Sequence, residues 1–323
     1  MTTLSRLQED IADELKLLNE DIAATLHSPN PLMNEVVDNY LRTKGKQIRP
    51  ILVILSAKLF GKVNPETISA ATSVELLHNA SLIHDDVVDE TKLRRNKPTI
   101  NGIWDNHIAV LVGDYFVSTA LQLVITTGDL RAVNTIASLG RLLSTGEIDQ
   151  INNATNHSIS EESYFEIITH KTASLFMPCV EMGANASDAT PEQLDIMRRF
   201  ALLFGQCFLI KDDIFDYFHS DSLGKPTGND LREGKVTLPL IYALNATGHP
   251  RCAEMNELVS HDRLSDEEIA TLIGYAIEAG GIEYADATLM RLRDEAAAVL
   301  ASLGDVDTTP LLSLLDYIIA RDM

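Results

Sequence analysis

Two short acidic segments with the same spacing lie far apart in this chain. They are Asp85-Asp86-Val87-Val88-Asp89 and Asp212-Asp213-Ile214-Phe215-Asp216. On an α-helix, residues at i, i+1 and i+4 project from adjoining parts of one face, so each segment directs three carboxylates to the same side. The preceding segments, 73–88 and 200–210, are strongly apolar, which is typical of helices buried in a bundle. Two matching acidic sites could therefore face each other across one cavity.

Apolar residues recur at helical rather than alternating spacing along nearly the whole chain. Turn signals divide it into pieces of helix length, at 28–31, 61–65, 127–129 and 190–191. At Thr190-Pro191-Glu192-Gln193, the threonine is suited to the N-cap, the proline to the first helical position and the amide to the third, which predicts a helix start. The sequence shows no series of short alternating strands, low-complexity linker or fixed-period repeat, so it predicts an all-α protein.

The aspartate clusters are candidate metal sites. Oxygen ligands without a neighbouring histidine or cysteine suit magnesium, which keeps several waters and is normally shared with substrate phosphates. A single triplet would be equally consistent with solvated aspartates on a helix surface. Two triplets, each ending a buried helix, favour a magnesium site for a ligand that carries a diphosphate.

Several basic residues stand out because the formal charge of the chain is −21. In the segment 44–50, Gly45 can bring backbone amides close to an anion, while Lys46 and Arg49 supply positive charge. Arg94 and Arg95 follow the first aspartate cluster, and guanidinium groups match phosphate oxygens. Either group alone could be ordinary surface charge.

Two further features extend this basic set. His78 shares a helical face with the first aspartate cluster, which favours a phosphate contact, although a lone histidine in an apolar helix is more often a core residue. The glycine-rich segment 222–234 carries Lys225 and is followed by Lys235. Its position after the second cluster predicts a flap that adds cations when substrate is bound, the alternative being an ordinary connection.

Composition excludes several classes of protein. The net charge and a pI of about 4.7 argue against nucleic acid as a partner. Cys179, Cys207 and Cys252 are widely separated, so neither a disulfide framework nor a zinc site is indicated. Residues 1–13 do not form a secretory signal, and the apolar run 200–210 is too short to cross a bilayer. We expect a cytoplasmic protein with at most transient membrane contact.

Together these segments closely resemble the trans-isoprenyl diphosphate synthase (polyprenyl synthetase) family, which includes octaprenyl and other long-chain polyprenyl diphosphate synthases. The resemblance runs from about residue 45 to about 239, and the paired aspartate motifs are highly specific. It implies one all-α domain over residues 1–323, a large helical bundle around a deep central cavity, and a homodimer. It also implies a prenyltransferase that condenses isopentenyl diphosphate with an allylic diphosphate, farnesyl or similar, with three Mg²⁺ ions clamping the allylic diphosphate.

The resemblance assigns roles residue by residue. The implied metal ligands are Asp85, Asp86, Asp89, Asp212, Asp213 and Asp216, with Asp85, Asp89 and Asp212 the most direct. The implied contacts to isopentenyl diphosphate are Gly45, Lys46, Arg49, His78 and Arg95, and those to the allylic diphosphate are Arg94, Lys171, Thr172, Lys225 and Lys235. The implied catalytic set is Asp85, Asp86, Asp89, Lys171, Asp212 and Asp213. The sequence departs from the family at Leu209, where many members have glutamine, which removes a polar side chain but no expected metal ligand.

Product length is predicted from two small residues. Ala80 and Ser81 lie about one helical turn, roughly 5.4 Å, below Asp85. Bulky aromatic residues there close the pocket in this family, so Ala80 and Ser81 imply a product longer than geranylgeranyl diphosphate. The floor of the pocket is expected deeper, within 116–125 or 136–148.

Three alternatives remain at this point. One is a short-chain synthase that makes farnesyl or geranylgeranyl diphosphate. Another is a non-catalytic subunit of a heteromeric synthase, although such subunits commonly lose motif aspartates and all six are present here. A third is a terpene cyclase, which would not need the second diphosphate site formed by Lys46, Arg49, His78 and Arg95.

Overall fold

The computed structural model is almost entirely helical, which confirms the all-α prediction. It describes residues 2–42, 45–94, 97–153, 160–218, 227–246, 248–261 and 263–321, without the side chains of 146–147, 149–153 and 171–174. Within these ranges the strands are β1 (Leu93–Arg94) and β2 (Lys97–Pro98), which pair antiparallel with Leu93 opposite Pro98. This small hairpin directly follows the first aspartate cluster.

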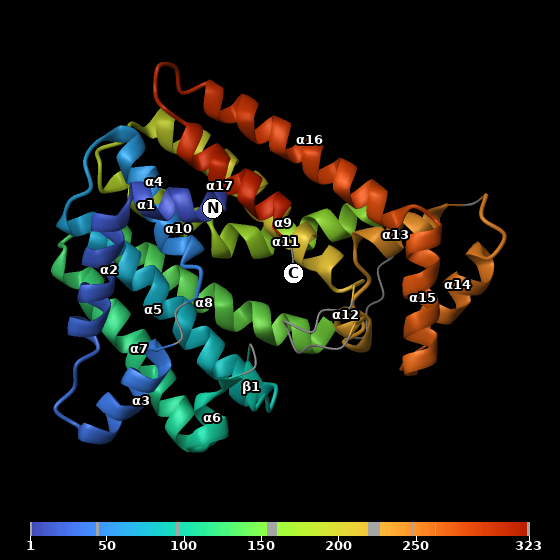
Figure 1. Cartoon of the computed structure of the whole chain (residues 1–323), viewed down its shortest axis with the longest axis horizontal. Coiled ribbons are helices and arrows are strands. Elements are labelled where there is room, and N and C mark those ends of the chain that lie inside the picture. Colours follow the sequence, from blue (N-terminus) through green and yellow to red (C-terminus); the bar gives the residue numbers. More distant parts are fainter. Residues whose placement is uncertain are drawn as a thin grey trace.

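The helices are α1 (Thr3–Asp10), α2 (Ala12–Thr25), α3 (Pro31–Leu41), α4 (Ile48–Phe60), α5 (Pro65–Val88), α6 (Ile100–Ile103), α7 (Asn106–Thr126), α8 (Leu130–Asn153), α9 (Glu161–Leu175), α10 (Met177–Asn185), α11 (Pro191–Phe215), α12 (Asn229–Arg232), α13 (Leu238–Asn245), α14 (Cys252–Val259), α15 (Asp266–Glu278), α16 (Gly281–Ala301) and α17 (Thr309–Ala320). Figure 1 shows α16 and α17 along one side of the molecule, α3, α6 and α7 on the opposite side, and α13 to α15 at one end.

Two long helices organise the core. Helix α5 packs against α2, α4, α7, α8 and α10, and α11 packs against α9, α10, α16 and α17. One large hydrophobic cluster includes residues from both of these groups, and a smaller one around Tyr275 joins α13, α14 and α15. Since α10 touches both α5 and α11, it connects the two halves of the bundle.

Local signals determine where α5 and α11 begin. The Asn64 side chain accepts the Thr67 N–H at 2.8 Å in a capping box, with Pro65 at the first helical position. The predicted start at Thr190 is confirmed, because Thr190 Oγ1 accepts the Gln193 N–H at 3.3 Å and the Gln193 side chain accepts the Thr190 N–H at 2.9 Å. Each aspartate cluster occupies the last turn of its helix, where the helix dipole is negative and carboxylates need nearby cations.

Helix α7 is apolar toward both of its sides. Its best window has a mean hydropathy of 1.9 and is 39% buried, and in the described part of the chain it alone is long and apolar enough to cross a membrane. The apolar run 200–210, which is too short to cross a bilayer, is shorter than this helix. One side packs on α5 at Gly113, where a Cβ would lie 2.2 Å from Nε2 of His84. The other side leaves Leu111 and Ile125 exposed, each at 60%.

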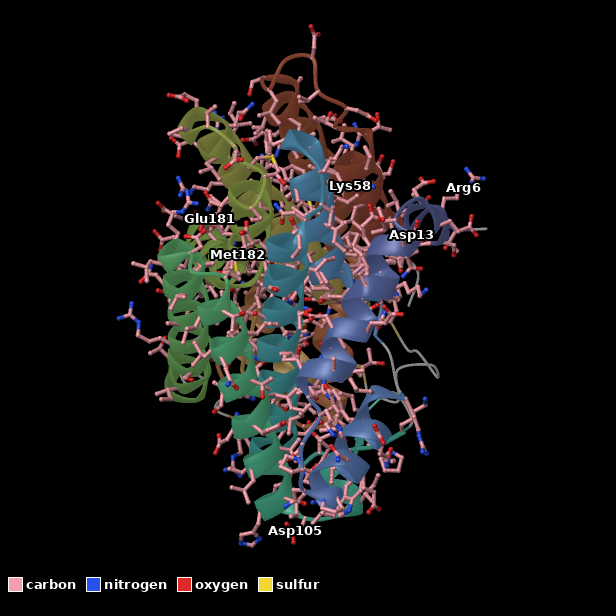
Figure 2. The ribbon with its side chains drawn as sticks, turned by 90° about the vertical axis from the view of Figure 1, so that its left-hand side faces the viewer. Arg6, Asp13, Lys58, Asp105, Glu181 and Met182 are labelled. Atoms are coloured by element: carbon pink, nitrogen blue, oxygen red, sulfur yellow. The ribbon has the colours of Figure 1, made fainter. Side chains whose placement is uncertain are left out.

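The N-terminal helices contact α4 and the C-terminal helix α17. Lys58 of α4 pairs with Glu14 of α2 at 2.6 Å, and α1 packs against α17. Figure 2 shows Lys58 toward one end of the molecule and Asp105, which caps α7, at the other. Packing by α1 therefore helps to fix α17, whose end reaches the second aspartate cluster.

Candidate active site

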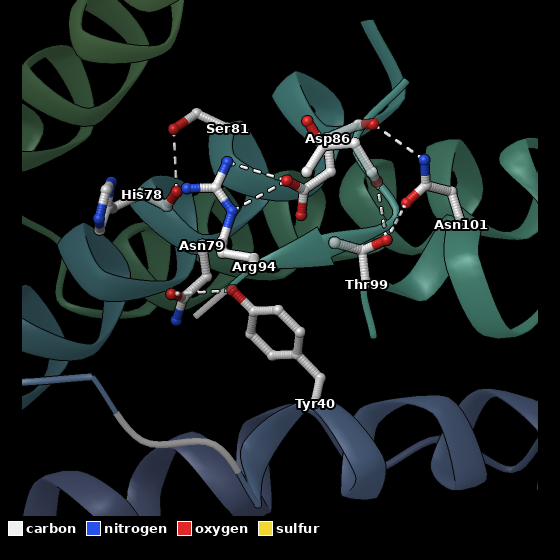
Figure 3. A network of polar contacts seen from close by, with 9 residues as sticks. Tyr40, His78, Asn79, Ser81, Asp86, Arg94, Thr99 and Asn101 are labelled. Atoms are coloured by element: carbon white, nitrogen blue, oxygen red, sulfur yellow. Dashed lines mark hydrogen bonds and ion pairs between the residues drawn. The ribbon is translucent and has the colours of Figure 1, made fainter. Parts of the chain in front are cut away.

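The first aspartate cluster is centred on Asp86, which is 7% exposed. Arg94, returned by the β1–β2 hairpin, places both Nε and Nη2 at 2.9 Å from Asp86 Oδ1. Asn101 donates its side-chain amide to the Asp86 carbonyl at 2.9 Å, and the Thr99 hydroxyl donates to Asn101 at 2.5 Å (Figure 3). This network holds Asp86 inward, while Asp85 is half-buried and Asp89 is exposed.

The turn of α5 below this cluster contains the residues predicted to control product length. Ala80 is fully buried, whereas the Ser81 hydroxyl donates to the His78 carbonyl at 2.9 Å. Tyr40 of α3 donates to the Asn79 side chain at 3.2 Å (Figure 3). His78 is half-buried and lies on the same stretch of helix as the cluster.

In the second cluster, Asp213 is held by a tyrosine from another helix. The hydroxyl of Tyr164, on α9, donates to Asp213 Oδ2 at 2.6 Å. Burial, reinforced by the negative charge of Asp213, raises the pKa of Tyr164 well above its ordinary value. The phenol therefore stays protonated and remains a donor at neutral pH.

Asp216 has a different role, because its carboxylate caps a short helix. Its two oxygens accept the backbone N–H groups of Asn229 at 2.9 Å and Asp230 at 3.0 Å. Its carbonyl also accepts the Gly228 N–H at 2.9 Å. Asp216 thereby attaches α12 to the end of α11.

Asp212 meets a cation that sequence analysis missed. Nη2 of Arg321, just after α17, lies 2.5 Å from Asp212 Oδ1 and 3.3 Å from the Phe208 carbonyl. The guanidinium lies 4.3 Å from the centre of the Phe208 ring and 5.3 Å from that of Phe215. An arginine that ends an apolar helix is common, so no signal in the sequence distinguished this one.

The basic segment before α4 approaches the same region. Arg49 lies over the Phe176 ring at 5.4 Å. Burial lowers the pKa of Arg49, while Glu75 and Asp212 are among the groups that oppose this shift. Lys46 is exposed and its Nζ lies 5.6 Å from the centre of the Tyr317 ring of α17. Gly45 beside it is also exposed.

The remaining predicted residues divide into two groups. Lys235 pairs with Glu233 at 2.5 Å, and its backbone N–H donates to the Asp230 carbonyl at 2.8 Å, close to the residues that Asp216 caps. Outside the described residues lie Arg95 and Lys225 and the side chains of Lys171 and Thr172. Their assigned roles stay predictions.

The three cysteines lie outside the aspartate clusters in sequence. All three are free, and burial raises the pKa of the Cys179 and Cys207 thiols to about 12. Thiols with so high a pKa are poor metal ligands and nucleophiles at neutral pH.

The described side chains form no ready-made cage for a metal, since no group of three or more His, Cys, Asp or Glu lies close enough together among them. Magnesium is usually bound through one or two carboxylates together with substrate phosphates. Asp85, Asp89 and Asp212 suit that role, because none of them is buried and each ends a helix. Asp86 and Asp216 are less suited, because Asp86 is buried and both oxygens of Asp216 accept backbone N–H groups, whereas Asp212 is exposed and one of its oxygens bonds Arg321.

A cavity of about 380 Å³ lies at the opposite end of α5. Its walls come from α5, α7, α8, α10 and the adjoining turns, and include Glu66, Ala70, Val124, Ala132 and Met182. Ala70 is fifteen residues before Asp85, which is about 22 Å along the helix. The cavity is therefore remote from the aspartate cluster but on the same helix.

An all-α bundle with carboxylate clusters ending two buried helices, surrounded by basic side chains, is the architecture of an isoprenyl diphosphate synthase. The chain belongs to the polyprenyl synthetase family, whose sequence profile matches residues 30–276, and it is a prenyltransferase. It is 32% identical over 297 residues to the octaprenyl diphosphate synthase of Haemophilus influenzae, covering 92% of this chain and 89% of the relative. It is 34% identical over 299 residues to the nonaprenyl diphosphate synthase of Mycobacterium tuberculosis, covering 92% and 89%.

Solved structures agree with this assignment. A decaprenyl diphosphate synthase from Rhodobacter capsulatus superposes with a TM-score of 0.86 at 31% identity, over 99% of this chain and all of that one. A geranylgeranyl pyrophosphate synthase from Bacteroides thetaiotaomicron superposes with a TM-score of 0.82 at 39% identity, over the whole of both chains. Because these names differ in product length, the family assignment leaves chain length to be argued from the site.

Proposed function

We propose that this prenyltransferase condenses isopentenyl diphosphate with an allylic diphosphate, farnesyl or similar, in a magnesium-dependent reaction. Its product is an all-trans polyprenyl diphosphate longer than geranylgeranyl diphosphate. The observation that carries this proposal is the pair of carboxylate clusters ending α5 and α11. Carboxylates in those positions are suited to cations that also bind a diphosphate.

In this proposal the allylic diphosphate and isopentenyl diphosphate are bound by different sets of residues. Asp85, Asp89 and Asp212 would hold Mg²⁺, which would stabilise the charge that develops as the allylic carbon–oxygen bond breaks. Arg94, Lys171 and Lys225 contact the allylic diphosphate, with Arg94 taken from its pairing with Asp86.

The carbon–carbon bond then forms away from water. Lys46, Arg49 and His78 orient isopentenyl diphosphate so that its double bond attacks the allylic cation. Apolar side chains around the site exclude water from that cation. No side-chain base is evident, so we assign the final proton to the departing diphosphate.

The product assay tests this function directly. Purified protein is incubated with labelled isopentenyl diphosphate, farnesyl diphosphate and Mg²⁺, with a chelator control, and the products are sized by chromatography. We expect a metal-dependent series that extends beyond twenty carbons. A single short product would retain the chemistry and refute the open pocket, and product that forms equally in chelator would refute the metal dependence.

The growing chain is proposed to follow one face of α5 away from the metal site. Ala80, Leu77, Ser73 and Ala70 succeed one another at three- and four-residue steps, so they share a face that ends at the 380 Å³ cavity. Leu77 is the bulky member of this series, and it faces Gly140 of α8, where a Cβ would lie 3.9 Å from Leu77 Cδ1. Ala80 adds little side-chain bulk to the upper part of this route.

Two substitutions on that face test the route. Ala80→Phe places an aromatic ring about one turn, roughly 5.4 Å, below Asp85 and is expected to shorten the product. Ala70→Phe places the same ring near the far cavity and is expected to shorten it less. Both product distributions are measured chromatographically against wild type. Identical distributions in all three proteins would refute the proposal that the growing chain follows this face of α5.

We propose a homodimer formed through α7 and α8. The exposed fractions are 60% for Leu111 and Ile125 of α7, and 81% for Leu130 and 65% for Ile148 of α8. So many exposed apolar side chains on two adjoining helices are typical of an interaction surface, and a second copy in the cytoplasm is our candidate partner. Light scattering should give twice the chain mass for wild type and a lower mass for Leu111→Glu; a monomeric wild type would refute the dimer.

A heteromeric enzyme is the second candidate assembly. The chain is 36% identical over 234 residues to heptaprenyl diphosphate synthase component 2 of Bacillus subtilis, covering 72% of this chain and 67% of that one. If the purified chain alone makes no product but does so with an added partner, this assembly replaces the homodimer.

A further inference from the structure

Arg321 occupies an unusual position for an arginine, because most of its guanidinium is enclosed. Its side chain is only 10% exposed, and it lies against the faces of Phe208 and Phe215. Nη2 donates to Asp212 Oδ1 at 2.5 Å, and the Asp212 side chain is 46% exposed. Contacts with the two rings and with Asp212 orient this guanidinium in the absence of ligands.

One donor of this guanidinium is unused. Nε of Arg321 is buried and has no hydrogen-bond partner within the described part of the chain. Buried N–H donors are nearly always paired in folded proteins, because an unpaired one loses its bonds to water without replacement. An orphaned donor beside a paired one is suited to a second acceptor, and the fork of arginine matches two phosphate oxygens.

The neighbours of Arg321 indicate which phosphate this is. Tyr317 lies four residues earlier and therefore on the same face of α17. Lys46 Nζ lies over the Tyr317 ring. Phe208 contacts Phe176 with ring centres 5.0 Å apart, and the Arg49 guanidinium lies over the Phe176 ring. Arg49 and Arg321 therefore lie over phenylalanine rings that touch each other, and Lys46 lies over a ring on the same face of α17 as Arg321. Three cations in one region repel each other unless an anion lies among them.

We propose that Arg321 serves two anions in turn. Before ligands bind, it neutralises Asp212; when a metal ion takes Asp212 Oδ1, the guanidinium turns its Nε–H and Nη–H groups to the diphosphate of isopentenyl diphosphate. This inference rests on the proposed function for the identity of the substrate. It makes Arg321 a substrate-binding residue and also a competitor of the metal.

These two roles predict effects of opposite sign in Arg321→Gln. Without substrate, Mn²⁺ measured by electron paramagnetic resonance should bind the variant more tightly than wild type, by about three- to tenfold, because its competitor at Asp212 is gone. With metal and an unreactive allylic analogue present, isopentenyl diphosphate measured by calorimetry should bind about tenfold more weakly, because a charge-assisted pair of hydrogen bonds is lost.

Two further variants control for packing. Arg321→Lys keeps the charge without the planar fork, so it should restore most of the competition with Mn²⁺ but little of the affinity for isopentenyl diphosphate. Arg293→Gln removes the pair between Arg293 and Asp316 of α17, at 2.8 and 3.2 Å, and should change neither affinity.

The outcomes separate this inference from the proposed function. Weaker or unchanged Mn²⁺ binding in Arg321→Gln, or unchanged binding of isopentenyl diphosphate, would overturn the inference. A wild-type chain that binds both ligands but makes no product would overturn the proposed function instead, while the two affinities would still decide the role of Arg321.

Discussion

The two aspartate clusters have the same spacing but are supported in different ways. The first is held by near neighbours in the chain: Arg94 is eight residues from Asp86, and Asn101 is fifteen. The second is held by distant ones: Tyr164 is 49 residues from Asp213, and Arg321 is 109 from Asp212. The geometry of the first cluster is thus mostly local, whereas that of the second depends on the packing of α9 and α17 against α11.

The clusters also differ at their last aspartate. Asp89 is exposed at the end of α5, whereas both Asp216 oxygens cap α12. Equal spacing in sequence therefore does not imply equal function. In our account the metal-binding residues are Asp85 and Asp89 from the first cluster and Asp212 from the second.

The largest expected effect comes from removing one principal carboxylate from either cluster. Asp85→Ala and Asp212→Ala should each lower turnover by at least about 10²–10³-fold, since each removes stabilisation of the charge that develops in the transition state. Steady-state product formation measures this, and an unchanged circular dichroism spectrum shows that the fold is retained. Near-normal turnover in either variant would show that the two clusters do not contribute equally and that the replaced aspartate is not a metal ligand.

A smaller difference should appear between the two last aspartates. Asp89→Ala should weaken Mg²⁺ activation by about tenfold more than Asp216→Ala, because exposed carboxylates are free to join the metal shell while a capping carboxylate is not. Asp216→Ala should instead destabilise the fold by about 0.5–2 kcal/mol, the usual cost of losing a cap. Magnesium titrations of activity and thermal unfolding measure the two effects. Equal losses of metal activation would mean that Asp216 leaves its cap to bind the ion.

The smallest effect on turnover concerns the support of the second cluster. Tyr164→Phe removes the hydrogen bond to the charged Asp213 and should cost about 1.5–3 kcal/mol of stability, with some loss of turnover. Tyr217→Phe is its matched control, since the buried Tyr217 hydroxyl bonds the neutral Thr237 at 2.9 Å and should cost about 0.5–1.5 kcal/mol. Denaturant unfolding compares them. Equal costs would show that the charge of Asp213 adds nothing to its contact with Tyr164.

This contrast explains what sequence could and could not predict. The helical pattern, the Thr190 helix start and the position of both aspartate clusters at helix ends are encoded within a few turns of chain, so these features were predicted correctly. The pairing of Arg94 with Asp86 is nearly local, and the proximity of the two residues was visible. Tyr164 and Arg321 carry no local signal, because their positions depend on how helices pack over long separations. For the same reason, the sequence did not predict that Asp216 caps α12, although it did assign Asp216 to an aspartate motif.

The apolar side of α7 was missed for another reason. Its polar residues, such as Asp114 and Tyr115, are spaced so that they interrupt the run without making the helix amphipathic. An apolar helix can face the core on one side and a partner on the other, and periodicity alone does not separate these cases.

Calorimetry tests the central claim, that both clusters bind metal together with an allylic diphosphate, most directly. Mg²⁺ is titrated into the chain in the presence of an unreactive allylic diphosphate analogue, for wild type, Asp85→Ala, Asp212→Ala and the surface control Asp294→Ala. We predict that the first two variants each bind fewer Mg²⁺ ions per chain than wild type, while the control binds the same number. Equal numbers of bound Mg²⁺ in all four proteins would contradict the account.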